Sequence, residues 1–467
     1  MLYAIVLALV VLVLLGVTIH KTLAIKNRTD FLVAGRKLPW PVLVFTLLSS
    51  WIGAGSLFGG AENAYRNGFA SLWQPAGGWF GLILIYFIAG RARRFEQFTV
   101  PDLLETRYNS VARLMGTVAI IVSCTVITSY QFIGGGDILH LIFPDIQRTT
   151  GMYIIAGFVI LFTAAAGMAS VAYLDLVIGS LVTVTVIVAL PLLLNHVGGW
   201  SHVRSTLPDD HFQVLGHISL RQALGYTLPT MLLLIGNQGM YQKFFSAKSE
   251  RDARLAVIGW IAGALLLETL LVTLAVIGSS TFRLDNPREI LPTTAKLGLP
   301  AIVGAVLLGG MFAKVISTAN NYLFSPATNI IHDIYGRFLN PTASEKQTLV
   351  ISRLVITVLG VLALIQGAYF TSILEAALYA YTIYGAAVTP AVMAVFFWKR
   401  ATTAGAIASI ALGTVVTIGW KYSGFDFDAI YPALGASVFS LIVISLLTPP
   451  PPPEKVNPFF EDSAHAA

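Results

Sequence analysis

Charged residues and cysteine are both scarce in this sequence of 467 residues. Asp, Glu, Lys and Arg together make up 11% of it, against about 25% in soluble globular proteins, which argues against a water-soluble enzyme of several domains. The single cysteine, Cys124, excludes an intramolecular disulfide and any zinc or iron–sulfur site built from several cysteines. The net charge is +6, but the basic residues flank apolar segments and form no basic polar domain, so no nucleic-acid partner is expected.

Motifs of enzyme chemistry are also missing. The eight histidines show no metal-ligand spacing, and no nucleophile stands with a base in a recognisable pattern. The glycines of 53–60 and 134–136 lie inside apolar segments, so they do not form a nucleotide-binding loop. The sequence therefore predicts no enzyme and no ATP hydrolysis, and any uphill transport must draw on an ion gradient. A solute receptor is a weaker alternative, since only about 20 residues follow the last apolar segment and offer no output domain.

Long apolar segments fill most of the chain, in which 56% of residues are hydrophobic. A segment of about 20 apolar residues is long enough to span a bilayer, and segments this long span as helices because lipid offers the backbone no hydrogen-bond partner. The sequence predicts an all-α integral membrane protein with about 13 transmembrane helices. The predicted spans are 2–22, 40–65, 70–90, 112–138, 151–169, 172–196, 220–242, 255–281, 298–330, 350–369, 373–398, 402–420 and 429–448.

The distribution of Lys and Arg predicts how the chain is oriented in an inner or plasma membrane. One set of alternate loops carries 20 of the 29 basic residues and the other set carries eight. Because cytoplasmic loops carry the excess, we expect the N-terminus outside and the C-terminus inside. The remaining basic residue, Lys314, falls within a predicted span. After the last span, five prolines at 449–453 favour a stiff spacer leading into a proline-rich disordered tail, 449–467.

Two spans contain residues that favour a break in the helix. The second reads SSWIGAGSLFGGAENAY, and the seventh contains Asn237 and Gln238 in IGNQGMYQK. Glycine weakens a helix, and unpaired amide side chains are costly at membrane depth. Close packing through small residues is the simpler explanation for one such span. Two spans five helices apart instead suggest an inverted repeat of two five-helix halves, each opening with a discontinuous helix.

The ninth span carries hydroxyl groups and a charge. Lys314, Ser317 and Thr318 share one helix face in GGMFAKVISTANNYLFSPATNIIHDIY. Two hydroxyls, together with carbonyls freed by a broken helix, could form half of a sodium site, although membrane Ser and Thr often bond back to their own helix. Lys314 and Asp175 are costly charges within spans, and a mutual pair, direct or through water, would relieve both. Glu268 is a third candidate for a buried charge.

At these residues the sequence resembles the sodium/solute symporter family, whose members share the LeuT-like inverted-repeat fold. The resemblance covers nearly the whole chain, and it lies in the order and spacing of several motifs. It implies a first accessory helix (1–23), a ten-helix transport core (40–398) with repeats of about 40–196 and 220–398, and two further accessory helices (402–448). The motifs are DFLVAGRKLPW, TVPDLLETRYN, AYLDLVIG, GNQGMYQK with AKSERDA, and AKVISTANNYLFSPATNIIHDIY.

The resemblance implies a sodium site between the first broken helix and the ninth span. Carbonyl groups of Ser49, Ile52 and Lys314 and the hydroxyls of Ser317 and Thr318 would hold the Na⁺, and Asp175 would lie along its inner exit. The family usually has a small residue where this chain has Lys314. The lysine could pair with Asp175, which we favour, it could replace sodium, or it could release a proton during coupling.

These observations together predict a secondary active transporter that moves a small organic solute with Na⁺ by alternating access. A proton-coupled or ion-independent transporter of the same fold, with Lys314 in place of sodium, is the alternative. Broken-helix N-termini favour a carboxylate-bearing or zwitterionic solute. The expected partners are this solute and the lipid bilayer, with no obligate protein partner implied. The candidate substrate contacts are Trp51, Gly53, Gly55, Ser56, Gln74, Gln131, Asn237 and Gln238.

Overall fold

The computed structural model describes residues 1–22, 32–95, 97–165, 168–420, 422–425 and 427–460. Within these ranges every regular element is a helix, and the strand-like pairing is limited to one isolated bridge between Leu38 and Ala247. Lys26, Arg28 and Asp30 of the first predicted loop, Lys421, and the tail from 461 to 467 lie outside the described residues. The prediction of an all-helical chain is confirmed for the part that the structure describes.

The helices follow the order of the predicted spans. Those of the first predicted repeat are α3 (Trp40–Trp51), η2 (Gly55–Gly60), α4 (Ala61–Asn67), η3 (Gly68–Leu72), α5 (Trp73–Arg94), α6 (Val100–Arg107), α7 (Ser110–Ile142), α8 (Arg148–Ala165) and α9 (Met168–His196). Those of the second are α11 (Leu220–Gly236), α12 (Gln238–Ser246), α13 (Glu250–Ser279), η5 (Pro287–Glu289), α14 (Ile290–Leu297), α15 (Ala301–Asn329), η6 (Ile330–Leu339), α16 (Glu345–Gly367), α17 (Ile373–Ala387) and α18 (Thr389–Phe397). The others are α1 (Leu2–Thr22), η1 (Ala34–Arg36), α10 (Trp200–Thr206), η4 (Asp209–Phe212), α19 (Thr403–Trp420), α20 (Ile430–Leu447) and α21 (Pro453–Phe460).

Ten helical segments in the described ranges are long and apolar enough to cross a membrane, or eleven if the bent pair α17 and α18 forms one span. The sequence predicted about 13 because it counted two broken segments as whole spans. In the structure α3 is too short to span the membrane alone. The helices that follow it, from η2 to α5, form one segment of 55–94. The seventh predicted span is divided between α11 and α12.

Both predicted breaks are present. Helix α3 ends at Trp51, Ile52 has an extended conformation (φ −88°, ψ 94°), and a π-helical turn begins at Gly55. Helix α11 ends at Gly236, and Asn237 leaves the helical region (φ −59°, ψ 114°) before α12 begins. An unpredicted bend of 41° separates α17 from α18. Interrupted backbone of this kind is tolerated at membrane depth only where protein or a water-filled cavity surrounds it.

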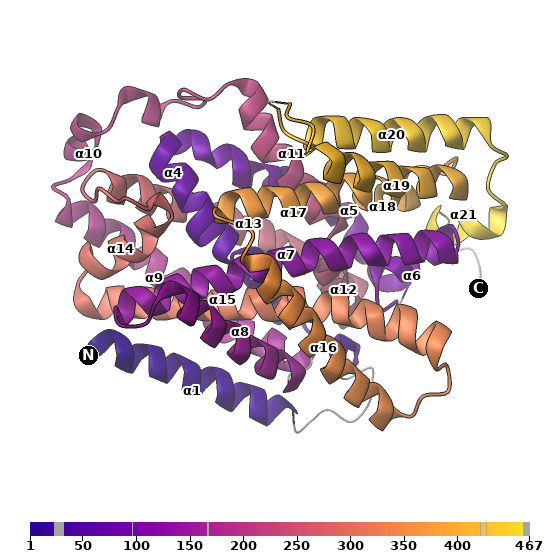
Figure 1. Ribbon diagram of the computed structural model, residues 1–467, viewed down its shortest axis with the longest axis horizontal. Coiled ribbons are helices and arrows are strands. Elements are labelled where there is room, and N and C mark those ends of the chain that lie inside the picture. The colour runs from indigo at the N-terminus through magenta and orange to yellow at the C-terminus, as the bar shows by residue number, and fades with distance from the viewer. Residues whose placement is uncertain (23–31, 96, 166–167, 421, 426, 461–467) are drawn as a thin grey trace.

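The breaks lie in the interior of a helical bundle (Figure 1). Helices α7 and α15 run through its centre and pack on each other, and α15 is buried on every side from Leu307 to Asn329. Helix α1 packs on α15 and α9 at one flank, whereas α19 and α20 pair with each other and contact α17 at the other. The start of α1 and the helix α21 lie at opposite ends of the long axis.

The expected disordered tail is wrong for part of its length. Residues 453–460 form the short helix α21, in which Phe459 is buried. The Phe459 ring stacks on Phe95 at 4.3 Å between centroids and meets Phe396 edge-on at 6.1 Å. Burial of one aromatic side chain contributes about 2 kcal/mol, enough to fix a segment that a proline run alone would leave extended.

Candidate functional site

Polar side chains of α7 and α15 form hydrogen bonds with the backbone at the first break. The Gln131 side-chain oxygen accepts the Ala54 N–H at 2.7 Å, and the Thr318 hydroxyl donates to the Ser49 carbonyl at 2.9 Å. A Cβ on Gly53 would lie 2.6 Å from Thr318 and 2.8 Å from Gln131, so only glycine fits between them. Gln131 thus stabilises the broken backbone and does not face the cavity described below.

The residues predicted to bind sodium come together beside this break. The Lys314 ammonium donates to the Ser49 hydroxyl at 3.0 Å, and the Ser317 hydroxyl donates to the Asp175 carboxylate. Ile52 is fully buried and forms the turn that ends α3. The site therefore gathers hydroxyl, carbonyl and carboxylate oxygens, the ligands that a hard cation prefers.

The sequence predicts that Asp175 and Lys314 pair either directly or through water, and the structure shows no direct ion pair between them. The Asp175 carboxylate accepts hydrogen bonds from the hydroxyls of Thr46, at 2.5 Å, and Ser317. No basic group of the described chain lies within the 4.0 Å that defines a salt bridge with it, although the Lys314 and Lys243 ammonium groups both act on it electrostatically. The hydroxyl of Ser317 connects the acidic residue to the hydroxyl-bearing face of α15.

Lys243 is part of this cluster, and the sequence analysis missed it. The residue follows the predicted span 220–242 directly, which places it in a loop, but its side chain is fully buried and its ammonium donates to Ser50 and, at 2.9 Å, to Asn321. The helical register of GNQGMYQK could have indicated this, because Lys243 follows Gly239 by four residues and so continues the inward face of α12. Two buried ammonium groups thus face one buried carboxylate.

At the second break, Asn237 and Gln238 form hydrogen bonds that hold neighbouring helices together. The Asn237 amide donates to the Tyr322 hydroxyl at 2.9 Å and its oxygen caps α12 through the Gly239 N–H. The Gln238 N–H donates to the Tyr384 hydroxyl at 2.8 Å, and the Gln238 side chain accepts the Val100 N–H. Both residues fix α12 against α15, α17 and α6. Neither lines the cavity beside the first break.

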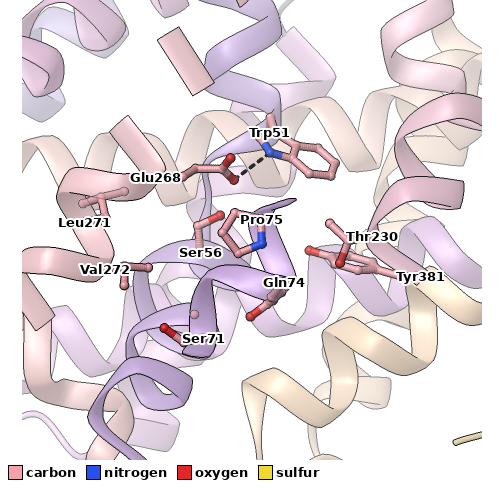
Figure 2. A pocket seen from close by; sticks show the side chains of 11 residues that line it. Trp51, Ser56, Ser71, Gln74, Pro75, Thr230, Glu268, Leu271, Val272 and Tyr381 are labelled. Atoms are coloured by element: carbon pink, nitrogen blue, oxygen red, sulfur yellow. Dashed lines mark hydrogen bonds between the residues drawn. The ribbon is translucent and has the colours of Figure 1, made fainter. Parts of the chain in front are cut away.

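That cavity contains about 450 Å³ of empty space, part of it open to solvent (Figure 2). Three of the predicted substrate contacts line it, Trp51, Ser56 and Gln74. Gly55 lies next to it, since a Cβ there would meet the Tyr381 hydroxyl at 2.8 Å. The other lining residues are Gly60, Ser71, Pro75, Thr230, Glu268, Leu271, Val272 and Tyr381.

A buried carboxylate forms one wall of the cavity. Glu268 is 4% exposed, and its two oxygens accept the indole N–H groups of Trp51 and Trp79, each at 2.8 Å. Figure 2 shows the Trp51 bond, with Ser56 and Pro75 next to the carboxylate. The sequence marked Glu268 as a buried charge without assigning it a place. Only the fold shows that it faces the same cavity as the first break.

Comparison with known proteins identifies the chain. The profile of the Sodium:solute symporter family matches residues 31–413. The chain belongs to this family. The match confirms the predicted class: a multi-pass membrane transporter that couples a small solute to Na⁺.

Among curated relatives of this symporter, the high-affinity proline transporter PutP of Bacillus subtilis (strain 168) is 26% identical over 453 residues, covering 90% of this chain and 93% of that protein. A sodium/proline symporter of Haemophilus influenzae is 24% identical over 472 residues, covering 93% and 92%. Among solved structures, a Na⁺-coupled sialic acid symporter aligns with a TM-score of 0.81 at 16% identity, covering 96% of this chain and 98% of that one. MhsT in complex with L-phenylalanine aligns at 0.54 with 15% identity, covering 88% and 99%. These structures confirm the LeuT-like fold.

The symporter also carries a charge network at the end of the bundle where α6 lies. The Arg113 guanidinium contacts Asp102 at 2.8 Å, Asp333 at 2.5 Å and Glu105. His332 contacts Asp102 at 3.0 Å, so Asp102, His332 and Asp333 bring three possible metal ligands together. Because the Arg113 guanidinium already contacts all three carboxylates, the network fits a clamp between α6, α7 and η6 better than a metal site.

Proposed function

We propose that this symporter moves a small zwitterionic amino acid, of which proline is the first candidate, together with Na⁺. The observation that carries the proposal is the cavity formed where the first broken helix passes α5, α11, α13 and α17. The same broken helix contacts α15 through the Ser49 carbonyl, which accepts a hydrogen bond from the Thr318 hydroxyl. Broken helices present free backbone groups to a solute and an ion at the same depth. The proline-transporting relatives, matched over nine-tenths of the chain, supply the candidate solute.

The proposed Na⁺ ligands are the carbonyl groups of Ser49, Ile52 and Lys314 and the hydroxyls of Ser317 and Thr318. Their support is that Thr318 and Lys314 both contact Ser49 across the break. Na⁺ held by the Ser49 carbonyl would be repelled by the Lys314 ammonium, which bonds the hydroxyl of the same residue. The contact with Ser49 therefore also makes Lys314 a competitor of the ion.

Uptake into proteoliposomes tests the proposal. Radiolabelled L-proline should accumulate when an inward Na⁺ gradient is imposed and should stay at equilibrium when choline replaces Na⁺. Equal uptake in both media, with accumulation driven by a pH gradient, would show that protons and not Na⁺ drive transport, through the ammonium groups of Lys243 and Lys314. Absence of proline uptake, with uptake of another solute under the Na⁺ gradient, would overturn the assignment of the solute alone.

We further propose the finer features of placement in the membrane. The chain would comprise an accessory helix (1–23), a transport core (40–398) and two accessory helices (402–448), with the N-terminus outside and the C-terminus in the cytoplasm. The opposite positions of the start of α1 and of α21 in Figure 1 support an odd number of crossings. The helix of the basic loop region, α6, lies at the same end as the C-terminal helix α21.

A further inference from the structure

Glu268 lacks a partner of opposite charge. Its carboxylate is buried, and its hydrogen bonds come from two neutral indole groups. Among the residues that the structure describes, no Lys, Arg or His nitrogen comes within 4.0 Å of it, and no charged neighbour influences it. A buried carboxylate held by neutral donors alone is unfavourable, because hydrogen bonding replaces only part of its lost hydration. A cation that enters from outside would relieve it.

The surroundings of Glu268 add to its preference for positive charge. Trp51 is the last residue of α3, so the carbonyl end of that helix, with its partial negative charge, lies on the same wall of the cavity. On α5, the Gln74 side chain is 6% exposed and its oxygen has no hydrogen-bond partner. Hydroxyls of Ser56 and Tyr381 complete the polar lining. The cavity is thus rich in acceptors and carries no basic residue.

We propose that Glu268 is the counter-ion for a positively charged nitrogen of the transported solute. The inference rests on the proposed function and narrows its solute class: an amine or an amino-acid ammonium group is required, and a carboxylic acid without nitrogen is excluded. Such a group can donate to Glu268 and to the Gln74 oxygen, which satisfies the two acceptors that the protein leaves unbalanced. The indole groups of Trp51 and Trp79 hold the carboxylate in position for this contact.

Three related compounds test the inference on the purified full-length protein in Na⁺ buffer. L-Proline carries both charges, pyrrolidine carries only the amine, and cyclopentanecarboxylate carries only the acid. A bound solute raises the melting temperature in proportion to its concentration relative to Kd. We expect proline and pyrrolidine to stabilise the wild type, and cyclopentanecarboxylate to need at least about a tenfold higher concentration for the same effect, because it loses a charge-assisted hydrogen bond.

Substitution of Glu268 should remove this selectivity. Glu268→Gln keeps an acceptor for the indoles but loses the charge, so the Kd values of proline and pyrrolidine should rise at least about tenfold while that of cyclopentanecarboxylate changes little. Glu268→Asp keeps the charge and should recover part of the affinity for proline and pyrrolidine. It provides a second test if Glu268→Gln folds poorly. Glu62→Gln is the matched control, since Glu62 is also buried but pairs with Arg66 outside the cavity.

The outcomes separate this inference from the proposed function. Proline uptake with Na⁺ and an unchanged proline Kd in Glu268→Gln would overturn the role of Glu268 and leave the symport of proline standing. Binding of pyrrolidine that depends on Glu268, without binding or uptake of proline, would support the role of Glu268 and overturn the solute assignment. A variant that only raises the Na⁺ requirement would make Glu268 an ion ligand and overturn the inference. Failure of all three compounds to stabilise the wild type would also overturn it.

Discussion

The Thr318 hydroxyl connects the broken helix to the face of α15 that we propose binds the ion. It donates to the Ser49 carbonyl at 2.9 Å and leaves its lone pairs available to a cation. Thr318→Val keeps the shape and removes the oxygen. We expect the Na⁺ concentration for half-maximal proline uptake to rise about tenfold, the effect of about 1.4 kcal/mol.

Ser325→Ala is the control for this substitution. Ser325 lies two turns further along α15, is equally buried, and its hydroxyl has no partner. Its removal should leave the Na⁺ dependence unchanged. An unchanged Na⁺ dependence in Thr318→Val as well would show that the hydroxyls of α15 do not bind the ion.

The balance of two buried ammonium groups against one carboxylate makes Asp175 the more critical member of the cluster. Asp175→Asn leaves Lys243 and Lys314 without negative charge, whereas Lys314→Met leaves Asp175 and Lys243 balanced. Loss of a buried charge partner costs about 3–5 kcal/mol. Thermal unfolding of the purified variants should therefore show a larger destabilisation for Asp175→Asn than for Lys314→Met.

The double variant distinguishes coupling from two independent effects. If the groups are coupled, adding Lys314→Met to Asp175→Asn should recover about 1 kcal/mol or more relative to the sum of the single changes, and uptake should recover with it. Additive losses would show that the ammonium of Lys314 stabilises the protein through Ser49 alone. Ser325→Ala is again the control, because it changes a residue of α15 outside the cluster.

At the scale of elements, the clamp around Arg113 holds α6 against α7 and η6. Helix α6 begins at a capping box in which Thr99 and Asp102 satisfy each other's backbone N–H groups, and Asp102 also contacts Arg113 and His332. Burial opposes ionisation of Asp102, but the hydrogen bond and charge of His332 and the charge of Arg113 outweigh it, so the pKa of Asp102 lies below its ordinary value. The lowered pKa means that the folded state favours the ionised form.

Asp102→Asn should therefore destabilise the protein by about 1–3 kcal/mol at neutral pH, because asparagine keeps the acceptor of the capping box and loses the charge. A carboxyl group with a lowered folded pKa stabilises above its unfolded pKa of about 3.9, and this contribution is lost as pH falls through the folded value. The deficit measured by thermal unfolding should be constant from about pH 5 to 8 and shrink below about pH 4. The exposed Asp145→Asn is the control, and a deficit that shrank with rising pH would contradict the charge assignment.

Local sequence predicted the elements well because the signals of broken helices are themselves local. Glycines near 53 and the Asn237–Gln238 step weaken helix wherever they occur, and both breaks formed there. The hydroxyl face of α15 follows from helical spacing alone. Glu268 could not be placed in this way, because its role depends on which helices pack against it. The bend between α17 and α18 falls between Gly385 and Pro390, a local signal that the sequence analysis did not use. Helix α21 depends on the distant rings of Phe95 and Phe396.

At the scale of the whole molecule, the outer and inner faces follow from the loops that gather at each end of the bundle. Helix α10 and the N-terminus lie at one end, whereas α6, α21 and the last described residues lie at the other (Figure 1). The positive-inside rule places loops with a basic excess in the cytoplasm, and we therefore propose that the α6 end of the bundle is the inner one. The cavity beside Glu268 lies nearer the middle of α13 than either of its ends, as alternating access requires.

Cysteine labelling can test this orientation because the chain provides a silent background. Its one cysteine, Cys124, is buried in the bundle and should not react with a membrane-impermeant maleimide. Ser205→Cys places an exposed thiol on α10, and Glu454→Cys places one on α21. In intact cells that express the protein, the reagent should label Ser205→Cys and leave Glu454→Cys unlabelled, whereas permeabilised cells should label both. Labelling of Glu454→Cys alone in intact cells would reverse the orientation, and with it the direction in which a Na⁺ gradient drives the solute.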